Sequence, residues 1–145
     1  MTFAGKNIYN NWTTQAIVDT GTTVLVMEDT DFQAFLAGFT AKNPAFQNYQ
    51  SSGTYVSNDK CPTTDSIFIS IGGAGKFEIP SDQYLQQYGD ASEGYQCVVR
   101  VASSGFAGFY ILGDVFIRNQ VCIFDYEKKA VGFSPIKDVP KMMLS

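Results

Sequence analysis

The stretch Ala16-Ile17-Val18-Asp19-Thr20-Gly21-Thr22-Thr23 decides how the rest of this sequence is interpreted. An apolar run leads directly into an acid, a hydroxyl residue and a glycine, which predicts a strand that ends in a tight turn. The hydroxyls of Thr20 and Thr22 can hydrogen-bond the carboxylate of Asp19 and favour its ionised form. This pattern is suited to presenting a carboxylate to a water molecule, but an aspartate that only stabilises a turn between strands has the same local sequence.

The overall composition excludes several classes of protein. The chain has 145 residues, of which 45% are hydrophobic and 17% charged, a balance typical of one domain with a packed core. A net charge of −4 without a basic stripe argues against a nucleic-acid partner. Because the chain contains no histidine, Ser-His-Asp and Cys-His catalysis and histidine-ligated zinc are excluded, and its three scattered cysteines do not form a thiolate cage. Acid–base chemistry would therefore depend on carboxylates.

The pattern of short apolar segments predicts a mainly β fold. Each segment is rich in β-branched or aromatic residues and is bounded by glycine, aspartate, asparagine or serine. Gly72-Gly73-Ala74-Gly75 is predicted to form a hairpin turn. The predicted strands are residues 16–18, 23–26, 66–71, 97–101, 109–112, 121–126 and 130–135.

Two short helices are predicted beside these strands. Thr30 and Asp31 can cap a helix over residues 32–40, which has phenylalanine and leucine side chains along one stripe. The second predicted helix covers residues 83–88, and Gly89 is its expected C-terminal cap.

Four segments, taken in order, resemble the carboxy-terminal lobe of the pepsin-like aspartic proteases, peptidase family A1. The first is similar to the family's second active-site segment, the next to its apolar-apolar-glycine segment, and the last two to its closing strands. These segments are residues 16–23, Ile111-Leu112-Gly113-Asp114-Val115-Phe116-Ile117-Arg118, Ile123-Phe124-Asp125 and Val131-Gly132-Phe133-Ser134-Pro135. The resemblance implies one lobe of the acid protease fold, a double-psi-type β-barrel or sandwich, over residues 1–136, with residues 137–145 as a tail.

The resemblance implies a role for each residue of the active-site segment. Asp19 would be one of two catalytic aspartates, and Thr20 would make a hydrogen bond that joins the two lobes. Gly21 would border the substrate backbone. Thr22 would hydrogen-bond Asp19, and together with Thr23 it would contact the substrate on the unprimed side.

Apolar residues near this segment are implied to line a pocket on the primed side. These are Ile17, Phe109 and Ile111, and plain core packing is the alternative interpretation for all three. Asp114, which follows Gly113, is a second acid near the site. We expect it to tune the local electrostatic field without belonging to the catalytic pair.

The implied mechanism uses two carboxylates and one water molecule. Carboxylates held close together share one proton over a broad acidic range, an effect for which aspartic proteases are the standard example. The ionised partner takes a proton from the water, which attacks the peptide carbonyl. The protonated partner polarises that carbonyl and later supports protonation of the leaving nitrogen. No cofactor, metal or covalent intermediate is required, and pepstatin-type inhibitors are expected to bind.

The cysteines indicate an oxidising compartment. In the family this lobe carries a disulfide at the positions of Cys61 and Cys97, which implies the same pair here. Cys122 remains on an apolar strand, where a buried, inert thiol is expected.

Asn11 begins a glycosylation sequon, a three-letter pattern that also arises by chance. No stretch has the roughly 18 apolar residues of a membrane span, and residues 1–7 do not resemble a signal peptide. Secretion or an acidic vesicle such as the lysosome or vacuole is expected.

The sequence also departs from the pattern of a complete enzyme. It contains one Asp-Thr-Gly, whereas a pepsin-like protease has two lobes that supply one aspartate each. It has no obvious flap tyrosine, and 18 residues precede Asp19, so we expect the amino-terminal lobe and the first strands of this lobe to be absent. A monomeric chain should therefore be inactive, because one carboxylate cannot be both acid and base.

Three hypotheses follow from the match and the departures. The chain is an aspartic endopeptidase lobe that works at acid pH only when a second lobe, on another chain, is paired with it. Alternatively, it forms a homodimer in which each subunit supplies Asp19, as in the retroviral proteases that it distantly resembles. In the third hypothesis it is a non-catalytic, truncated homologue that binds peptides.

Overall fold

The structure is a computed structural model of the 145-residue chain. It describes the backbone of residues 2–3, 6–7, 15–71, 75–105, 109–118, 120–125, 127 and 130–135. Side chains are described for residues 16–70, 76–105, 110–118 and 127.

The described chain consists mainly of short strands, which confirms the predicted mainly β fold. The strands are β1 (Thr2–Phe3), β2 (Lys6–Asn7), β3 (Gln15–Val18), β4 (Leu25–Met27), β5 (Gln47–Asn48), β6 (Tyr55–Ser57), β7 (Ile67–Ile71), β8 (Gly75–Ile79), β9 (Leu85–Asp90), β10 (Gly94–Val99), β11 (Val101–Ser103), β12 (Phe109–Leu112), β13 (Gln120–Asp125) and β14 (Ala130–Pro135). The helices are α1 (Asp29–Lys42), α2 (Ser81–Tyr84), α3 (Asp114–Ile117) and the 3-10 helix η1 (Tyr49–Ser51).

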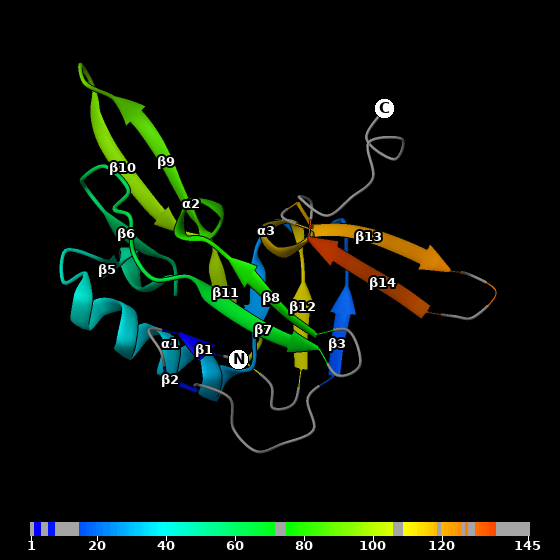
Figure 1. Cartoon of the computed structure of the whole chain (residues 1–145). Coiled ribbons are helices and arrows are strands. Elements are labelled where there is room, and N and C mark those ends of the chain that lie inside the picture. The colour runs from blue at the N-terminus through cyan, green and yellow to red at the C-terminus, as the bar shows by residue number, and fades with distance from the viewer. Residues whose placement is uncertain are drawn as a thin grey trace.

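These strands form several small sheets. The strand orders are β2-β1-β7-β8, β5-β6-β10-β9, β11-β4-β12-β3 and β13-β14. Strands β7 and β8 pair as an antiparallel hairpin, as the glycine-rich segment between them predicted. Two hairpins, β9–β10 and β13–β14, extend from opposite sides of the molecule (Figure 1).

The sheet that contains β3 has a ψ-type crossing. Strands β3 and β4 follow one another in the sequence, but β12 lies between them in the sheet. Strand β12 runs parallel to β3 and antiparallel to β4, with Ile111 opposite Ile17 on one side and Val26 on the other. The loop from Asp19 to Val24 therefore has to pass over the end of β12. This crossing agrees with the acid-protease topology expected from the sequence.

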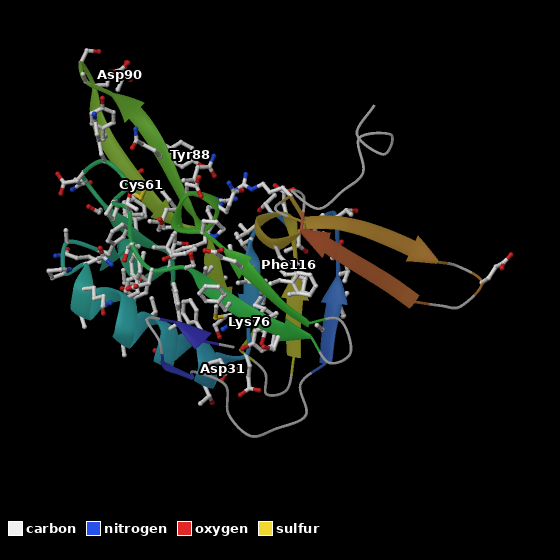
Figure 2. The ribbon with its side chains drawn as sticks, in the orientation of Figure 1. Asp31, Cys61, Lys76, Tyr88, Asp90 and Phe116 are labelled. Atoms are coloured by element: carbon white, nitrogen blue, oxygen red, sulfur yellow. A yellow bond between two sulfur atoms is a disulfide. The ribbon has the colours of Figure 1, made fainter. Side chains whose placement is uncertain are left out.

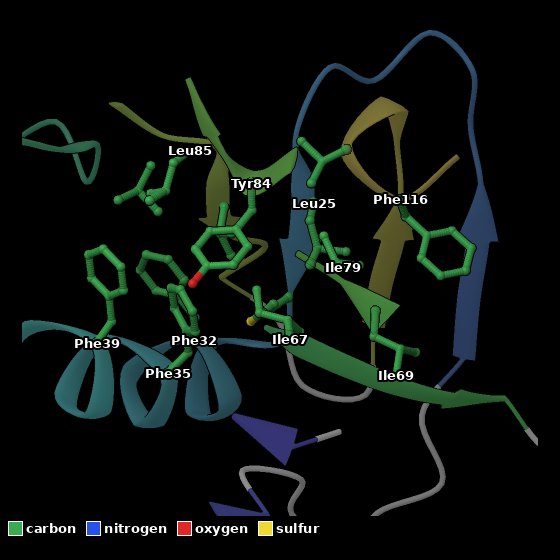
Figure 3. Close-up of a cluster of buried hydrophobic side chains, with 14 of the residues drawn as sticks. Leu25, Phe32, Phe35, Phe39, Ile67, Ile69, Ile79, Tyr84, Leu85 and Phe116 are labelled. Carbon is green, nitrogen blue, oxygen red and sulfur yellow. The ribbon is translucent and has the colours of Figure 1, made fainter. Parts of the chain in front are cut away.

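Aromatic side chains of α1 form one end of the hydrophobic core, as Figure 3 shows. The predicted stripe of phenylalanine and leucine is buried, and it faces Tyr84 at the end of α2. The rings of Phe35 and Tyr84 meet edge to face with centroids 5.9 Å apart, and those of Phe39 and Phe46 with centroids 4.8 Å apart. Burying each such ring contributes about 1.5–3 kcal/mol, so this cluster fixes α1 against the sheets.

The predicted cap of the first helix was wrong. Helix α1 begins at Asp29, and Glu28 occupies the N-cap position. Asp31 is fully buried inside the first turn, and its carboxylate accepts a hydrogen bond from the Tyr110 hydroxyl of β12. Asp31 therefore makes a tertiary contact and not a local cap. Figure 2 shows Asp31 near the start of α1.

The second predicted helix, over residues 83–88, was wrong after Tyr84. Helix α2 ends at Tyr84, and the following residues pair along the whole of β10, from Leu85 opposite Val99 to Asp90 opposite Gly94. Gly89 has φ +85°, and a Cβ there would lie 2.0 Å from the carbonyl oxygen of Gly94. This glycine therefore allows close strand pairing and does not end a helix. Asp90 lies at the exposed tip of the hairpin (Figure 2).

A disulfide joins Cys61 to Cys97, which are 36 positions apart, and confirms the predicted pair. Cys97 is fully buried on β10. The backbone of Cys122 pairs with Phe133 in the β13–β14 hairpin, while its predicted buried thiol lies outside the described side chains. No helix in the described ranges is long and apolar enough to cross a membrane.

Candidate functional site

The carboxylate of Asp19 lies at the end of β3 and is held by two hydrogen bonds. The backbone N–H of Gly21 donates to Oδ1 at 2.9 Å, and the hydroxyl of Thr22 donates to Oδ2 at 2.7 Å. These bonds lower the pKa of Asp19; the Thr22 hydroxyl has the larger effect and the Gly21 amide the smaller. Of the two hydroxyls predicted to bond the acid, that of Thr22 does so, whereas the second bond comes from the Gly21 amide and not from the Thr20 hydroxyl. Both bonds favour the charged form of Asp19.

The backbone around Asp19 is tied to the end of β12. The N–H of Asp19 donates to the carbonyl oxygen of Leu112 at 3.2 Å, and that of Asp114 donates to the carbonyl oxygen of Thr22 at 2.7 Å. A Cβ on Gly113 would lie 2.5 Å from the carbonyl oxygen of Thr22 and 2.3 Å from that of Val24. Gly113 is therefore required because the loop passes directly over its Cα. The active-site segment, residues 16–23, and the apolar-apolar-glycine segment, residues 111–118, therefore meet at Gly113.

The remaining hydroxyls of the loop face outward. Thr20 and Gly21 are exposed, so both are accessible to another molecule. Thr23 is also exposed, and its Oγ1 accepts a hydrogen bond from Nη2 of Arg100 at 3.1 Å. Sequence reasoning did not single out Arg100, because it is 77 positions from Thr23 and belongs to no motif. Its only signal was a charged residue inside the otherwise apolar segment 97–101.

Two of the predicted pocket residues lie together on the face away from the core. Ile17 and Ile111 are paired in the β3–β12 register. Tyr110 and Leu112 are buried, so the alternation of a strand places Ile111 on the opposite face. Ile17 is 47% exposed, which is not expected of a residue in the core of this chain. The side chain of Phe109 lies outside the described side chains.

Asp114 lies close to the loop in the fold. It is the first residue of α3, it is exposed, and Oδ2 lies 4.0 Å from Nη1 of Arg118. Its backbone contact with Thr22 places it beside the loop, and its influence on the catalytic field remains a prediction. Asn11 and the tail 137–145 lie outside the described residues.

Comparison with known proteins agrees with this fold. The family model of the eukaryotic aspartyl proteases matches residues 1–136. The chain therefore belongs to the eukaryotic aspartyl protease family, as its motifs predicted.

The curated relatives include a pepsin from Bos taurus and related enzymes from Penicillium and Aspergillus. Pepsin A of Bos taurus is 34% identical over 94% of this chain, which covers 35% of the length of that relative. Penicillopepsin-1 of Penicillium janthinellum is 31% identical over 82% of this chain and 34% of its own length. Aspergillopepsin-1 of Aspergillus clavatus is 34% identical over 81% of this chain and 28% of its own length. The chain thus spans about a third of the length of these relatives.

Proposed function

We propose that residues 1–136 form the carboxy-terminal lobe of a pepsin-like aspartic endopeptidase and that residues 137–145 are a tail. In this proposal Asp19 is one of the two catalytic aspartates, and a second lobe supplies the other. The observation that carries the proposal is the pair of hydrogen bonds from Gly21 and Thr22, which hold the Asp19 carboxylate ionised at the end of β3.

The chemistry follows from bringing a second carboxylate up to Asp19. The two like charges would share one proton in the acidic range, and the proton would belong to the pair. The ionised member would take a proton from a bound water as that water attacks the peptide carbonyl. The protonated member would polarise the carbonyl and then support protonation of the leaving nitrogen. One chain alone supplies only half of this arrangement.

The surfaces around Asp19 suit the proposed partners. Thr20 is exposed and available for a hydrogen bond to the second lobe. Gly21, Thr22 and Thr23 would border a peptide substrate, and Gly21 keeps that border free of a side chain. Ile17 and Ile111 offer an apolar surface on the face away from the core, which suits an apolar substrate side chain on the primed side.

The proposed compartment is secreted or acidic and vesicular. The disulfide between Cys61 and Cys97 supports an oxidising environment. An acidic medium would also keep one shared proton on the catalytic pair.

The direct test is cleavage of casein at acid pH, with the oligomeric mass measured in the same buffer. The chain is assayed alone and mixed with a separately expressed amino-terminal lobe of a related protease such as pepsin A. We expect an inactive monomer alone and pepstatin-sensitive cleavage by the mixture. Pepstatin-sensitive cleavage by a homodimer would mean that two copies of Asp19 form the pair. Peptide binding without cleavage in either sample would contradict the endopeptidase proposal and favour a peptide-binding module.

A matched pair of variants separates the role of Asp19 from general effects of charge. Asp19→Asn should abolish cleavage while the fold is retained. Asp90 is the control, because its exposed carboxylate is also held by short-range donors, from Ser92 and Glu93, that lower its pKa. Asp90→Asn should leave cleavage unchanged, because the tip of the β9–β10 hairpin has no proposed catalytic role.

A further inference from the structure

Arg100 occupies a fixed position beside the active-site loop. It is the single residue between β10 and β11. Its N–H donates to the carbonyl oxygen of Tyr84 at 2.7 Å, and its carbonyl oxygen accepts from the N–H of Leu25 at 3.1 Å. Tyr84 and Leu25 are themselves fully buried core residues (Figure 3). The backbone of Arg100 is therefore held by a hydrogen bond on each side, which fixes the position of its Cα relative to the loop.

The guanidinium of Arg100 reaches the exposed edge of the loop, where it makes one hydrogen bond within the described part of the chain. Its Nη2 donates to Oγ1 of Thr23 at 3.1 Å, whereas a guanidinium carries five N–H donors. Within the described side chains, Lys42 has a carboxylate partner in Asp65 and Arg118 has one in Asp114, but Arg100 has none. Among the described side chains no acid lies beside this partly exposed arginine, so its charge is available to a ligand.

The charge of Arg100 does not contribute to the lowered pKa of Asp19. The causes that lower the pKa of Asp19 are the Thr22 hydroxyl and the Gly21 amide, and Arg100 is not among them. The position of Arg100 next to Thr23 places the cation at the border where the loop would meet substrate, beyond the catalytic carboxylate itself.

We propose that Arg100 is a specificity-determining residue that binds an acidic side chain of the substrate on the unprimed side, which Thr22 and Thr23 would border. The inference rests on the proposed endopeptidase function and names a substrate class for it: peptides with a glutamate or aspartate on that side. A planar guanidinium can bind a carboxylate through two parallel hydrogen bonds, which is a reason for arginine at such a position.

The expected size of this preference is modest and depends on pH. An ion pair at a partly exposed site corresponds to roughly a 1.5- to 5-fold preference for glutamate over glutamine. Arginine stays charged throughout the acidic range, whereas a glutamate side chain ionises near pH 4.3. The preference should therefore be present above about pH 5 and be lost by about pH 3.

The experiment compares two peptide substrates that differ by one residue, glutamate or glutamine, at each unprimed position in turn. The catalytically active assembly of the chain is assayed by kcat/KM at pH 5.5 and pH 3, with pepstatin as the inhibitor control. Arg100→Gln should remove the preference for the glutamate peptide, and Arg100→Glu should reverse it in favour of the glutamine peptide. Lys42→Gln is the matched control, since it removes one exposed positive charge at the end of α1 and should keep the preference.

The ratio between the two peptides distinguishes recognition from a structural role of the Arg100–Thr23 bond. Loss of loop structure would lower kcat/KM for both peptides equally and leave the ratio unchanged, which would overturn the inference while the proposed function stands. If no assembly cleaves any peptide, the proposed function fails, and binding of the same peptides is measured by fluorescence anisotropy. If the chain binds the glutamate peptide more tightly and Arg100→Gln removes this preference, Arg100 is still supported as the recognition residue. If the chain binds both peptides equally, that role of Arg100 is overturned too.

Discussion

The hydroxyl of Thr22 donates a hydrogen bond of 2.7 Å to Oδ2 of Asp19, three positions earlier in the chain. It is the largest cause of the lowered pKa of Asp19, ahead of the Gly21 amide. The charge state of the proposed catalytic acid is therefore set within one turn, by residues that stay together wherever the loop forms.

Thr22→Val should raise the pKa of Asp19, because the variant loses the donor and keeps the shape of the side chain. Carbon-detected NMR titration of the Asp19 carboxyl in the isolated chain measures this shift. Thr22→Ser should restore the low pKa, since it keeps the hydroxyl. An unchanged Asp19 pKa in Thr22→Val would show that the hydroxyl does not control the ionisation.

The same hydrogen bonds predict that Asp19 stabilises the fold more at higher pH than at lower pH. The folded pKa of Asp19 is lower than its unfolded value, so Asp19 adds stability above the unfolded pKa of about 3.9. This contribution is lost as the pH falls through the folded pKa. Thermal unfolding of the wild type and Thr22→Val from pH 6 to pH 2 should show the larger difference at the higher pH. A constant difference over this range would contradict the linkage.

Gly113→Ala should destabilise the fold by about 3 kcal/mol or more, at the upper end of the cost of overpacking. The new Cβ would lie 2.3 Å from the backbone oxygen of Val24, and backbone cannot move aside as a side chain can. Gly53→Ala is the control, because Gly53 has φ +84° but open space around it and should lose only about 1–2 kcal/mol. Urea unfolding of the two variants tests the difference, and equal losses would show that the loop does not require the glycine.

Tyr110→Phe should cost about 1–3 kcal/mol, because it removes a donor from the fully buried carboxylate of Asp31. Tyr88→Phe is the matched control: Tyr88 is 44% exposed on β9, and its variant should stay within about 0.5 kcal/mol of the wild type. Urea unfolding measures both variants. If they behaved alike, the contact between α1 and β12 would not contribute to stability.

Cys61→Ser with Cys97→Ser should lower stability by about 3–4 kcal/mol, on the chain-entropy estimate for a loop of this length. Thermal unfolding with and without a reductant measures the loss, and the double variant should no longer respond to the reductant. Thiol labelling of the unreduced, denatured chain should find Cys122 alone. Labelling of Cys61 or Cys97 in that sample would contradict the disulfide.

The sequence correctly predicted those elements whose structure depends mainly on a short local segment. The strand before Asp19, the strand over 109–112 and the apolar stripe of α1 were all correct, because each is visible in the local pattern of apolar residues. The hydrogen bond from Thr22 to Asp19 spans three positions and was also predicted, whereas the Gly21 amide makes the second bond, which had been predicted for the Thr20 hydroxyl.

The errors arose where distant contacts override local preference. Residues 85–88 have side chains that suit a helix, but full pairing with β10 makes them a strand. Asp31 has the chemistry of a helix cap, but Tyr110, on a strand 79 positions away, uses its carboxylate. Arg100 was missed for the same reason, since only the folded chain brings it to Thr23.

The insertion of β12 between β3 and β4 makes the Asp19 loop a late product of folding. Strands β3 and β4 cannot reach their final separation until residues 109–112 have been synthesised and have entered between them. Such non-local pairing is slow to form, because a long loop must close before any contact compensates for the lost entropy. A nascent chain that has not reached Phe109 therefore carries Asp19 without the strand that positions its loop at the end of β12.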